Sequence, residues 1–183
     1  MTAFDDVAAQ HADGTLRGAS FDGTGLTTTL WSDGVTDNIE WGDQVAGDFN
    51  GDGRSDVAAR DQQSGRWTVW LSDGESFTSD VWGFWSSSKD WDQVHAGDFN
   101  GDGRTDIAGR IQDAGDGRWF VSLSTGSSFQ TTVWGSWTTA KTWGQTGLGD
   151  FNGDGLADLV GRIQDFGDGR WFVSLSDGSR FVT

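Results

Sequence analysis

The segment Gly47-Asp-Phe-Asn-Gly-Asp-Gly-Arg-Ser-Asp56 decides the fold, because nearly the same run of residues returns at 97–106 and at 149–158. The copies start about 50 residues apart, and the sequence between them also repeats. Self-similarity at a fixed period of this length is the signature of an array of structural repeats. The chain is therefore predicted to be built of repeated units of about 50 residues.

Within one repeat the apolar residues alternate with a period of two, which indicates β-strands and not helices. Strands are expected at residues 44–49, 56–60, 66–71 and 77–85, separated by turns rich in Gly and Asp. Four short strands in about 50 residues are typical of one blade of a β-propeller. The predicted fold class is all-β, a β-propeller of four-stranded antiparallel blades, with about three and a half to four blades in this chain.

The repeats divide the chain into four parts of one predicted domain, residues 1–183. The first part, 1–40, is partial, because Asp6-Val-Ala-Ala9 matches the residues that follow the loop in the next copy. Two complete repeats are expected at 41–90 and 91–142, followed by a shortened repeat at 143–183. The first repeat therefore starts just after its own loop.

The charge of the chain is strongly negative, with 28 acidic and 12 basic residues and a formal net charge of −16. A negative field of this size argues against a nucleic-acid partner and against an anionic membrane surface. No apolar run approaches the ~20 residues of a membrane span, and no signal peptide is visible at the N-terminus. Cations are the natural counterpart of such a chain.

The repeated loop has the residue pattern of a calcium site. Counted from its first aspartate, positions 1, 3 and 5 send alternate oxygen-bearing side chains inward, and Gly at position 6 permits a sharp turn. Position 7 would offer its backbone carbonyl, and Asp at position 9 would close the shell. The predicted ligands are Asp48, Asn50, Asp52, Arg54 and Asp56; Asp98, Asn100, Asp102, Arg104 and Asp106; and Asp150, Asn152, Asp154, Leu156 and Asp158.

The loop differs from an EF-hand at two points. An EF-hand needs a bidentate Glu at position 12 and flanking helices, whereas position 12 holds Ala59, Gly109 and Gly161 and both flanks read as strands. One such segment alone could be an ordinary Asp-Gly turn, but three complete copies favour metal binding. We expect about three calcium ions, each acting as a structural staple of the fold.

The pattern Asp-Phe-Asn-Gly-Asp-Gly-Arg-x-Asp between two strands resembles the FG-GAP/VCBS repeat family, which includes the β-propeller of integrin α-subunits. The resemblance covers essentially the whole chain. It implies blades of four antiparallel strands with calcium in the loop between the first two strands of each blade. Members of the family typically have seven blades, and this chain is too short to close such a ring. A homodimer that completes the ring, a longer array and a small four-bladed ring are the open alternatives.

Ten of the twelve tryptophans fall into two groups. Those that repeat in register with the loop are expected to fill the space between blades; they are Trp41, Trp67, Trp91, Trp119, Trp143 and Trp171. The Trp-x-x-Trp pairs near the fourth strand are the candidates for an exposed ligand-binding face; they are Trp82, Trp85, Trp134 and Trp137.

Two further sets of repeated residues have a structural interpretation. Arg60, Arg110 and Arg162 are each expected to bridge to a neighbouring carboxylate. The clusters at 113–117 and 165–169 could bind another ion, but Asp-Gly before a strand favours a hairpin turn.

Catalysis finds little support in the sequence. The chain has two histidines, no Cys and no Tyr, and no nucleophile elbow is present. The expected function is a non-catalytic calcium-binding module for protein interaction or adhesion, located outside the cell or at the cell surface, with a bacterial origin favoured. The alternative is a calcium-dependent lectin that binds glycans through exposed Trp residues.

Overall fold

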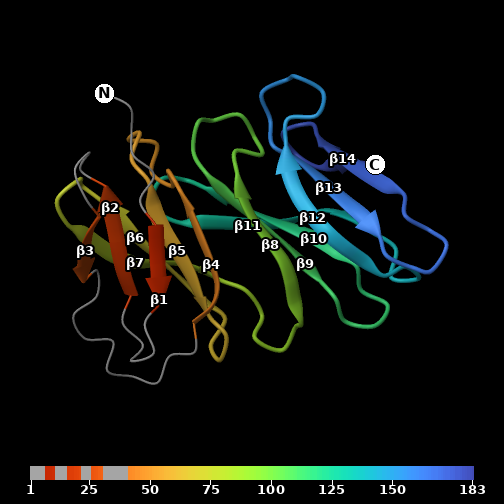
Figure 1. Ribbon diagram of the computed structural model, residues 1–183, viewed down its shortest axis with the longest axis horizontal. Coiled ribbons are helices and arrows are strands. Elements are labelled where there is room, and N and C mark those ends of the chain that lie inside the picture. Colours follow the sequence, from red (N-terminus) through yellow and green to blue (C-terminus); the bar gives the residue numbers. More distant parts are fainter. Residues whose placement is uncertain (1–6, 11–15, 22–25, 31–40) are drawn as a thin grey trace. The chain divides into compact units, whose positions relative to one another are not determined.

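The computed structural model describes residues 7–10, 16–21, 26–30 and 41–183, and their regular structure is entirely β (Figure 1). The strands are β1 Val7–Gln10, β2 Leu16–Phe21, β3 Leu26–Leu30, β4 Trp41–Gly47, β5 Asp56–Asp61, β6 Arg66–Ser72, β7 Phe77–Phe84, β8 Trp91–Gly97, β9 Asp106–Ile111, β10 Arg118–Ser124, β11 Phe129–Ser136, β12 Trp143–Gly149, β13 Asp158–Ile163, β14 Trp171–Ser176 and β15 Phe181–Val182.

The strands form antiparallel meanders in which each strand pairs with the next one along the chain. Within the described residues, β1–β3 make a three-stranded sheet, and three four-stranded sheets follow: blade 2 (β4–β7), blade 3 (β8–β11) and blade 4 (β12–β15). This all-β, four-stranded organisation confirms the predicted fold class. The predicted first repeat falls partly on residues 1–6, 11–15, 22–25 and 31–40, which lie outside the described part of the chain.

The first strand of each blade begins at its tryptophan, three residues earlier than the strand expected at 44–49. A β-bulge interrupts the pairing of β4, β8 and β12 just after that tryptophan. In blades 3 and 4 the bulge places Gln93 and Gln145 at positive φ, 55° and 47°. Glutamine is not a residue that marks such a conformation in a sequence, so the bulge and the extra strand length were not predicted.

The chain divides into two compact units, Met1–Ser87 and Ser88–Thr183. Unit 2 contains blades 3 and 4, which pack face to face: β12 lies against β8, and β15 lies against β11. Figure 1 shows β8 and β12 as the neighbouring strands of the two blades. The apolar core between them is made by residues from both blades: Phe99, Ala108, Trp119, Val121, Trp134 and Trp137 from blade 3, and Leu159 and Phe181 from blade 4. Consecutive blades in this unit therefore share one core.

The Trp-x-x-Trp pairs lie in the interior, so the prediction that they form an exposed face was wrong. Trp82, Trp85, Trp134 and Trp137 are all 4% exposed or less. The pairing of the third and fourth strands shifts register at Trp82 and Trp134, so that each is the extra residue of a bulge. A bulge interrupts the alternation of side chains on which the predicted exposure of Trp82 and Trp134 depended.

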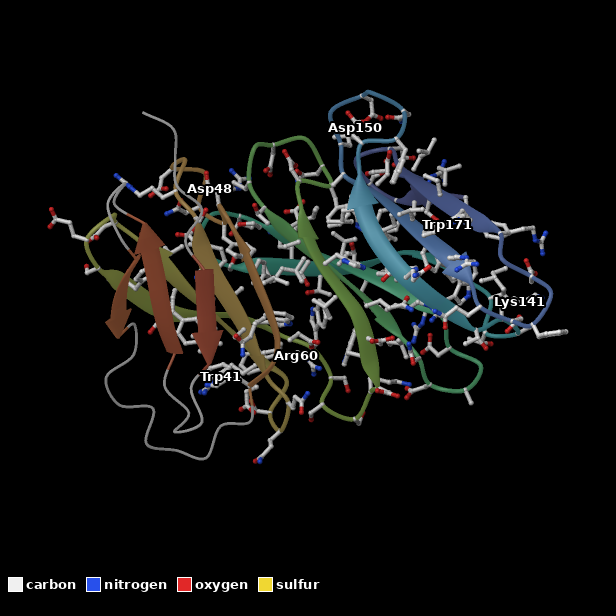
Figure 2. All side chains as sticks on the ribbon, in the orientation of Figure 1. Trp41, Asp48, Arg60, Lys141, Asp150 and Trp171 are labelled. Carbon is white, nitrogen blue, oxygen red and sulfur yellow. The ribbon has the colours of Figure 1, made fainter. Side chains whose placement is uncertain are left out.

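Two of the tryptophans predicted to fill the core do so completely. Trp67 and Trp119 are at most 1% exposed, and Trp119 contacts Trp137 edge to face at 5.0 Å between ring centroids. Trp171 holds the same sequence position in blade 4 but is 56% exposed (Figure 2). For Trp171 the prediction was therefore wrong, although the residue and its strand are those expected.

Candidate functional site

The three aspartate loops connect the first and second strands of blades 2, 3 and 4, as Figure 2 shows for the loops that contain Asp48 and Asp150. The chain turns back on itself at the two glycines in positions 4 and 6 of each loop, counted from the first aspartate. In the first loop these are Gly51 and Gly53, with φ of 81° and 84°. Positive φ is readily adopted by glycine only, which explains why both glycines are present in all three copies.

The aspartate at position 1 organises each loop from its centre. Asp48 accepts the backbone N–H of Gly51 at Oδ1 and that of Gly53 at Oδ2, both at 2.7 Å. Asp98 and Asp150 make the same two bonds in their loops. The side chains at positions 1, 3 and 5 therefore lie within one tight turn of backbone, as the alternation predicts.

The aspartate at position 9 is buried and joins the loop to the third strand of its blade. Asp56 Oδ2 accepts the N–H of Phe49, and its Oδ1 accepts the N–H of Ser72, each at 2.9 Å. Asp106 and Asp158 are held in the same way, and all three are 0% exposed. This structural bond to the third strand was not predicted, since the sequence shows only the ligand pattern.

Burial raises the pKa of two of these carboxyl groups. The pKa of Asp106 rises to about 7 because the group is buried and, to a smaller extent, because Asp102 and Asp98 are negative, although two backbone N–H bonds oppose the rise. The pKa of Asp56 rises to about 6 for the same reasons. A negative charge at position 9 is therefore unfavourable unless a cation lies nearby.

Position 7 divides the loops into two kinds. Arg54 and Arg104 pair with the position-5 aspartates Asp52 and Asp102 at 2.8 and 2.5 Å. The third loop has Leu156 at this position, so Asp154 has no arginine of its own loop beside it. The third loop thus has one positive charge fewer than the other two.

The donor set of each loop fits calcium, which prefers carboxylate, amide and carbonyl oxygens. Positions 1, 3, 5 and 9 supply side-chain oxygens. In the first two loops burial, and to a smaller extent the negative charges at positions 5 and 1, raises the pKa of the carboxyl group at position 9. Across the described residues, however, no three acidic or histidine side chains converge into a compact metal centre. The loops thus match calcium in the kind of oxygen donor and in the course of their backbone, but their carboxylates do not already form a compact cluster.

Two residues of blade 4 also donate hydrogen bonds to the loop of blade 3. The N–H of Ala157 donates to the carbonyl of Asp98 at 2.8 Å, and Ser176 Oγ donates to the carbonyl of Phe99 at 2.7 Å. A Cβ on Gly97 would meet the Ala157 side chain at 2.9 Å, which shows how closely the two blades approach here. These contacts were not predicted, because the loop pattern describes one repeat and not its neighbour.

The Asp-Gly clusters at 113–117 and 165–169 form turns between the second and third strands of blades 3 and 4. Their aspartates are neutralised by a lysine from the segment before each blade: Lys89 lies 2.7 Å from Asp113, and Lys141 lies 3.3 Å from Asp168. The expected turn is therefore what the structure contains, and its charges already have partners.

The three repeated arginines differ in their contacts. Arg60 makes the expected bridge, with Nε 2.8 Å from Asp43. Arg162 instead donates to the carbonyl of Gly169 and to Gln145, each at 3.3 Å. Arg110 is buried, and its Nε has no hydrogen-bond partner.

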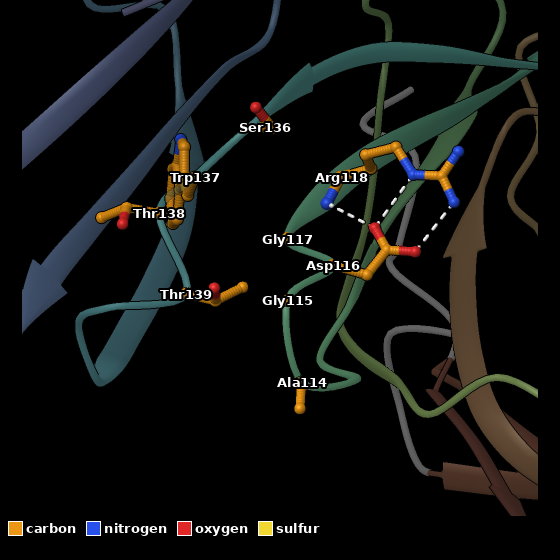
Figure 3. Close-up of a pocket in the computed structure, with 9 residues that line it drawn as sticks. All are labelled: Ala114, Gly115, Asp116, Gly117, Arg118, Ser136, Trp137, Thr138 and Thr139. Carbon is orange, nitrogen blue, oxygen red and sulfur yellow. Dashed lines mark hydrogen bonds and ion pairs between the residues drawn. The ribbon is translucent and has the colours of Figure 1, made fainter.

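A pocket of about 590 Å³ lies beside the β9–β10 turn of blade 3 (Figure 3). The turn forms one wall, and the segment that follows β11 forms the other. Asp116 and Arg118, joined by an ion pair at 2.8 Å, stand on the first wall, and the hydroxyl side chains Thr138 and Thr139 stand on the second. The Arg118 hydrogen bond lowers the pKa of Asp116 to about 2, so its carboxylate is charged at neutral pH.

One histidine, His95, lies among the described residues. Its Nε2 lies 2.9 Å from Thr146 Oγ1, and its ring stacks on Trp119 at 6.3 Å. Burial lowers its pKa. No helix that could span a membrane occurs in the described part of the chain.

The fold of the chain is similar to that of a solved lectin structure. The whole chain superposes on 52% of a lectin chain from Agrocybe aegerita with a TM-score of 0.68 and 17% sequence identity. That lectin was solved in a study of its specific recognition of non-reducing terminal N-acetylglucosamine. The chain thus spans about half the length of this structure, and the likeness shows the fold. No curated protein matches the chain in sequence.

Comparison with protein families agrees with the repeat pattern. Residues 48–109 match the FG-GAP-like repeat, and residues 91–128 match the FG-GAP repeat. Both matches contain the aspartate loop of blade 3 and the strand before it, and the second also contains the whole strand after it. The chain therefore carries repeats of the FG-GAP family over residues 48–128.

Proposed function

We propose that the chain is a non-catalytic β-propeller module that binds calcium in its three aspartate loops and serves protein interaction or adhesion. The observation that carries this proposal is the threefold recurrence of one loop conformation with the same oxygen donors. In the first loop the ion would be held by Asp48, Asn50, Asp52 and Asp56 and by the carbonyl of Arg54. The equivalent residues would hold it in the second and third loops.

Calcium would act as a staple between strands. Each loop carries three carboxylates, and the one at position 9 is buried with a raised pKa in blades 2 and 3. A divalent cation supplies the positive charge that favours the ionised form of all three. Loops without an acid at position 12 are weak sites, and weak modular sites suit millimolar extracellular calcium. This supports a location outside the cell or at its surface.

Thermal unfolding with calcium and with a chelator tests the calcium proposal. Calcium at 100 times its Kd stabilises a protein by about 2.7 kcal/mol per independent site. The melting temperature should therefore rise on adding calcium and return after chelation, and magnesium at the same concentration serves as the control ion. Identical melting curves in calcium and in chelator would remove the proposal.

A second candidate function, glycan binding, is favoured by the pocket beside the β9–β10 turn. Its charged and hydroxyl groups suit the hydroxyl groups of a sugar, and the fold is shared with a lectin. Of the Trp-x-x-Trp residues, Trp137 lines this pocket, although it is 4% exposed. A glycan array that includes N-acetylglucosamine, probed with and without calcium, tests it.

A matched pair of variants sharpens the glycan test. Asp116→Asn changes the pocket wall, whereas Asp168→Asn makes the same change in the equivalent turn of blade 4. If the pocket binds glycans, the first substitution lowers the signal and the second leaves it unchanged. Absence of binding to every glycan, with calcium present, would leave the protein-binding role alone.

A further inference from the structure

Each aspartate loop contains an asparagine that is followed directly by a glycine, at positions 3 and 4. The backbone nitrogen of the next residue can attack the side-chain carbonyl carbon of an asparagine, and a glycine leaves that approach open because it has no Cβ. Asparagine therefore loses its side-chain amide most readily before glycine. The three pairs are Asn50-Gly51, Asn100-Gly101 and Asn152-Gly153.

Hydrogen bonds in the closed loop oppose this reaction at both reacting groups. In the third loop the N–H of Gly153 donates to Asp150 Oδ1 at 2.7 Å, and this carboxylate disfavours the loss of the proton that the attack requires. Asn152 Oδ1 accepts the N–H of Asp154 at 3.0 Å, and its Nδ2 donates to Asp154 Oδ2 at 2.8 Å. The side-chain amide is thus fixed, and the reaction requires a local opening of the loop.

The first two loops contain the same hydrogen bonds, so these bonds alone do not distinguish the three asparagines. The loop of blade 3 is held by blade 4 in addition. Blade 4 donates hydrogen bonds to the carbonyls of Asp98 and Phe99, the two residues directly before Asn100. A Cβ on Gly101 would meet the side chain of Leu156 at 2.9 Å, so blade 4 also lies against the Asn-Gly pair itself.

The Asn-Gly pair of blade 4 is open to solvent. Asn152 and Gly153 are both exposed, whereas Asn100 is half-buried. A Cβ on Gly153 would meet no atom within 4 Å. Residues 151–154 can therefore open by losing the loop's own hydrogen bonds, whereas opening around Asn100 also requires the loss of the two bonds that blade 4 donates.

We propose that Asn152 is a site of deamidation, at which the chain is modified without an enzyme. When the loop opens, the backbone nitrogen of Gly153 gives up its proton and forms a bond to Cγ of Asn152. The bond between Cγ and Nδ2 breaks, and ammonia leaves with that proton, so that a succinimide ring remains. Water then opens the ring to aspartate or isoaspartate. Asn100 undergoes the same reaction more slowly, because blade 4 keeps its loop closed.

The modification changes the third loop irreversibly. Either product adds a carboxylate to a loop that already has three, which increases the repulsion within it. Isoaspartate also lengthens the backbone by one carbon atom between positions 3 and 4, so that Gly153 no longer has the same place relative to Asp150.

Mass spectrometry of the full chain, incubated at neutral pH in chelator and in water enriched in heavy oxygen, tests the proposal. The heavy oxygen labels each asparagine that deamidates during the incubation. Cleavage after arginine and lysine places the three Asn-Gly pairs in separate peptides, 18–54, 90–104 and 142–162. In the folded chain Asn152 should react at least about fivefold faster than Asn100, since one ordinary hydrogen bond changes an equilibrium by about that factor. In urea, which opens every loop, the two rates should be nearly equal.

Asp150→Ala and Asp168→Ala are the matched variants. Asp150 accepts the N–H of Gly153, so its replacement should raise the rate at Asn152. Asp168 lies in the β13–β14 turn of the same blade, outside the loop, and its replacement should leave that rate unchanged. Circular dichroism should show that both variants remain folded.

Two results would overturn the proposal: equal rates at Asn152 and Asn100 in the folded chain, or equal acceleration by the two variants. Because every measurement is made in chelator, failure here is distinct from failure of the proposed function.

Discussion

The aspartate loops of blades 3 and 4 have the same ligand pattern, but they differ in what surrounds them. The loop at 98–106 has an arginine at position 7, and the next blade donates hydrogen bonds to its backbone carbonyls. The loop at 150–158 has Leu156 at that position, and the phenylalanine at its second position is half exposed. The comparison teaches that the neighbouring blade, as well as a repeat's own residues, sets the stability of that repeat.

The largest expected contrast separates the two equivalent tryptophans. Trp119→Ala opens a cavity in the core shared by blades 3 and 4 and should lower the free energy of unfolding by about 3–5 kcal/mol. Trp171→Ala removes a side chain that is 56% exposed and should cost less than about 1 kcal/mol in a dilute, monomeric sample. Urea unfolding of both variants measures the difference, and equal losses would mean that the neighbouring blade contributes nothing at this position.

A smaller loss is expected when the buried carboxylate of the loop is removed. Asp106→Ala leaves the N–H groups of Phe99 and Ser124 buried without acceptors and should cost about 2–3 kcal/mol. Because these bonds do not involve a metal, the loss should appear in chelator as well as in calcium. A variant that is destabilised in calcium alone would show that Asp106 acts only as a ligand.

The raised pKa values predict the pH dependence of the calcium-free protein. Burial raises the pKa of Asp106 to about 7 in the folded state, whereas in the unfolded state the carboxyl group has its ordinary pKa of 3.8. The folded state therefore binds more protons between these values, and stability rises as the pH falls from 8 to 5. In chelator the melting temperature should increase by about 2–4 °C, roughly the effect of 1 kcal/mol in a protein of this size.

This pH effect should be smaller when Asp106 is replaced by Asn, and the remainder comes from Asp56, whose pKa is raised to about 6. Calcium should weaken or reverse it, because the ion favours the ionised carboxylate. A melting temperature that falls steadily from pH 8 to pH 5 in chelator would contradict the assignment.

The smallest predicted effect concerns position 7. Arg104→Leu removes the cation that pairs with Asp102 and should strengthen calcium binding in that loop, whereas Leu156→Arg should weaken it in the third loop. Exposed ion pairs are worth about 0–1 kcal/mol, so the Kd should change by no more than about fivefold. Terbium luminescence sensitised by tryptophan, or titration calorimetry, can compare the two variants. Changes of the same sign in both would contradict the role given to the arginine.

The sequence was sufficient for the fold because its local signals agree with the global architecture. The alternating apolar residues and the Asp-Gly turns predicted the strands and their connections. The loop pattern predicted that loop positions 1, 3 and 5 carry oxygen-bearing side chains. The bulges at Trp134 and Gln93 could not be predicted from the sequence, since tryptophan and glutamine are not residue types that mark a bulge. Contacts such as Ser176 to Phe99 escaped for another reason: they join two repeats, whereas the motif describes one.

Because Ala157 of blade 4 donates a hydrogen bond to the carbonyl of Asp98, the loop of blade 3 depends on the blade that follows it in the chain. Blade 3 can form its own strands during synthesis, but the carbonyl of Asp98 gains this donor only after blade 4 has followed it. Fraying at the far end of unit 2 would accordingly loosen the loop one blade earlier, while damage to blade 3 would leave the loop at 150–158 without such a consequence. Loss of order in blade 4 should thus reach the loop of blade 3, but not the reverse.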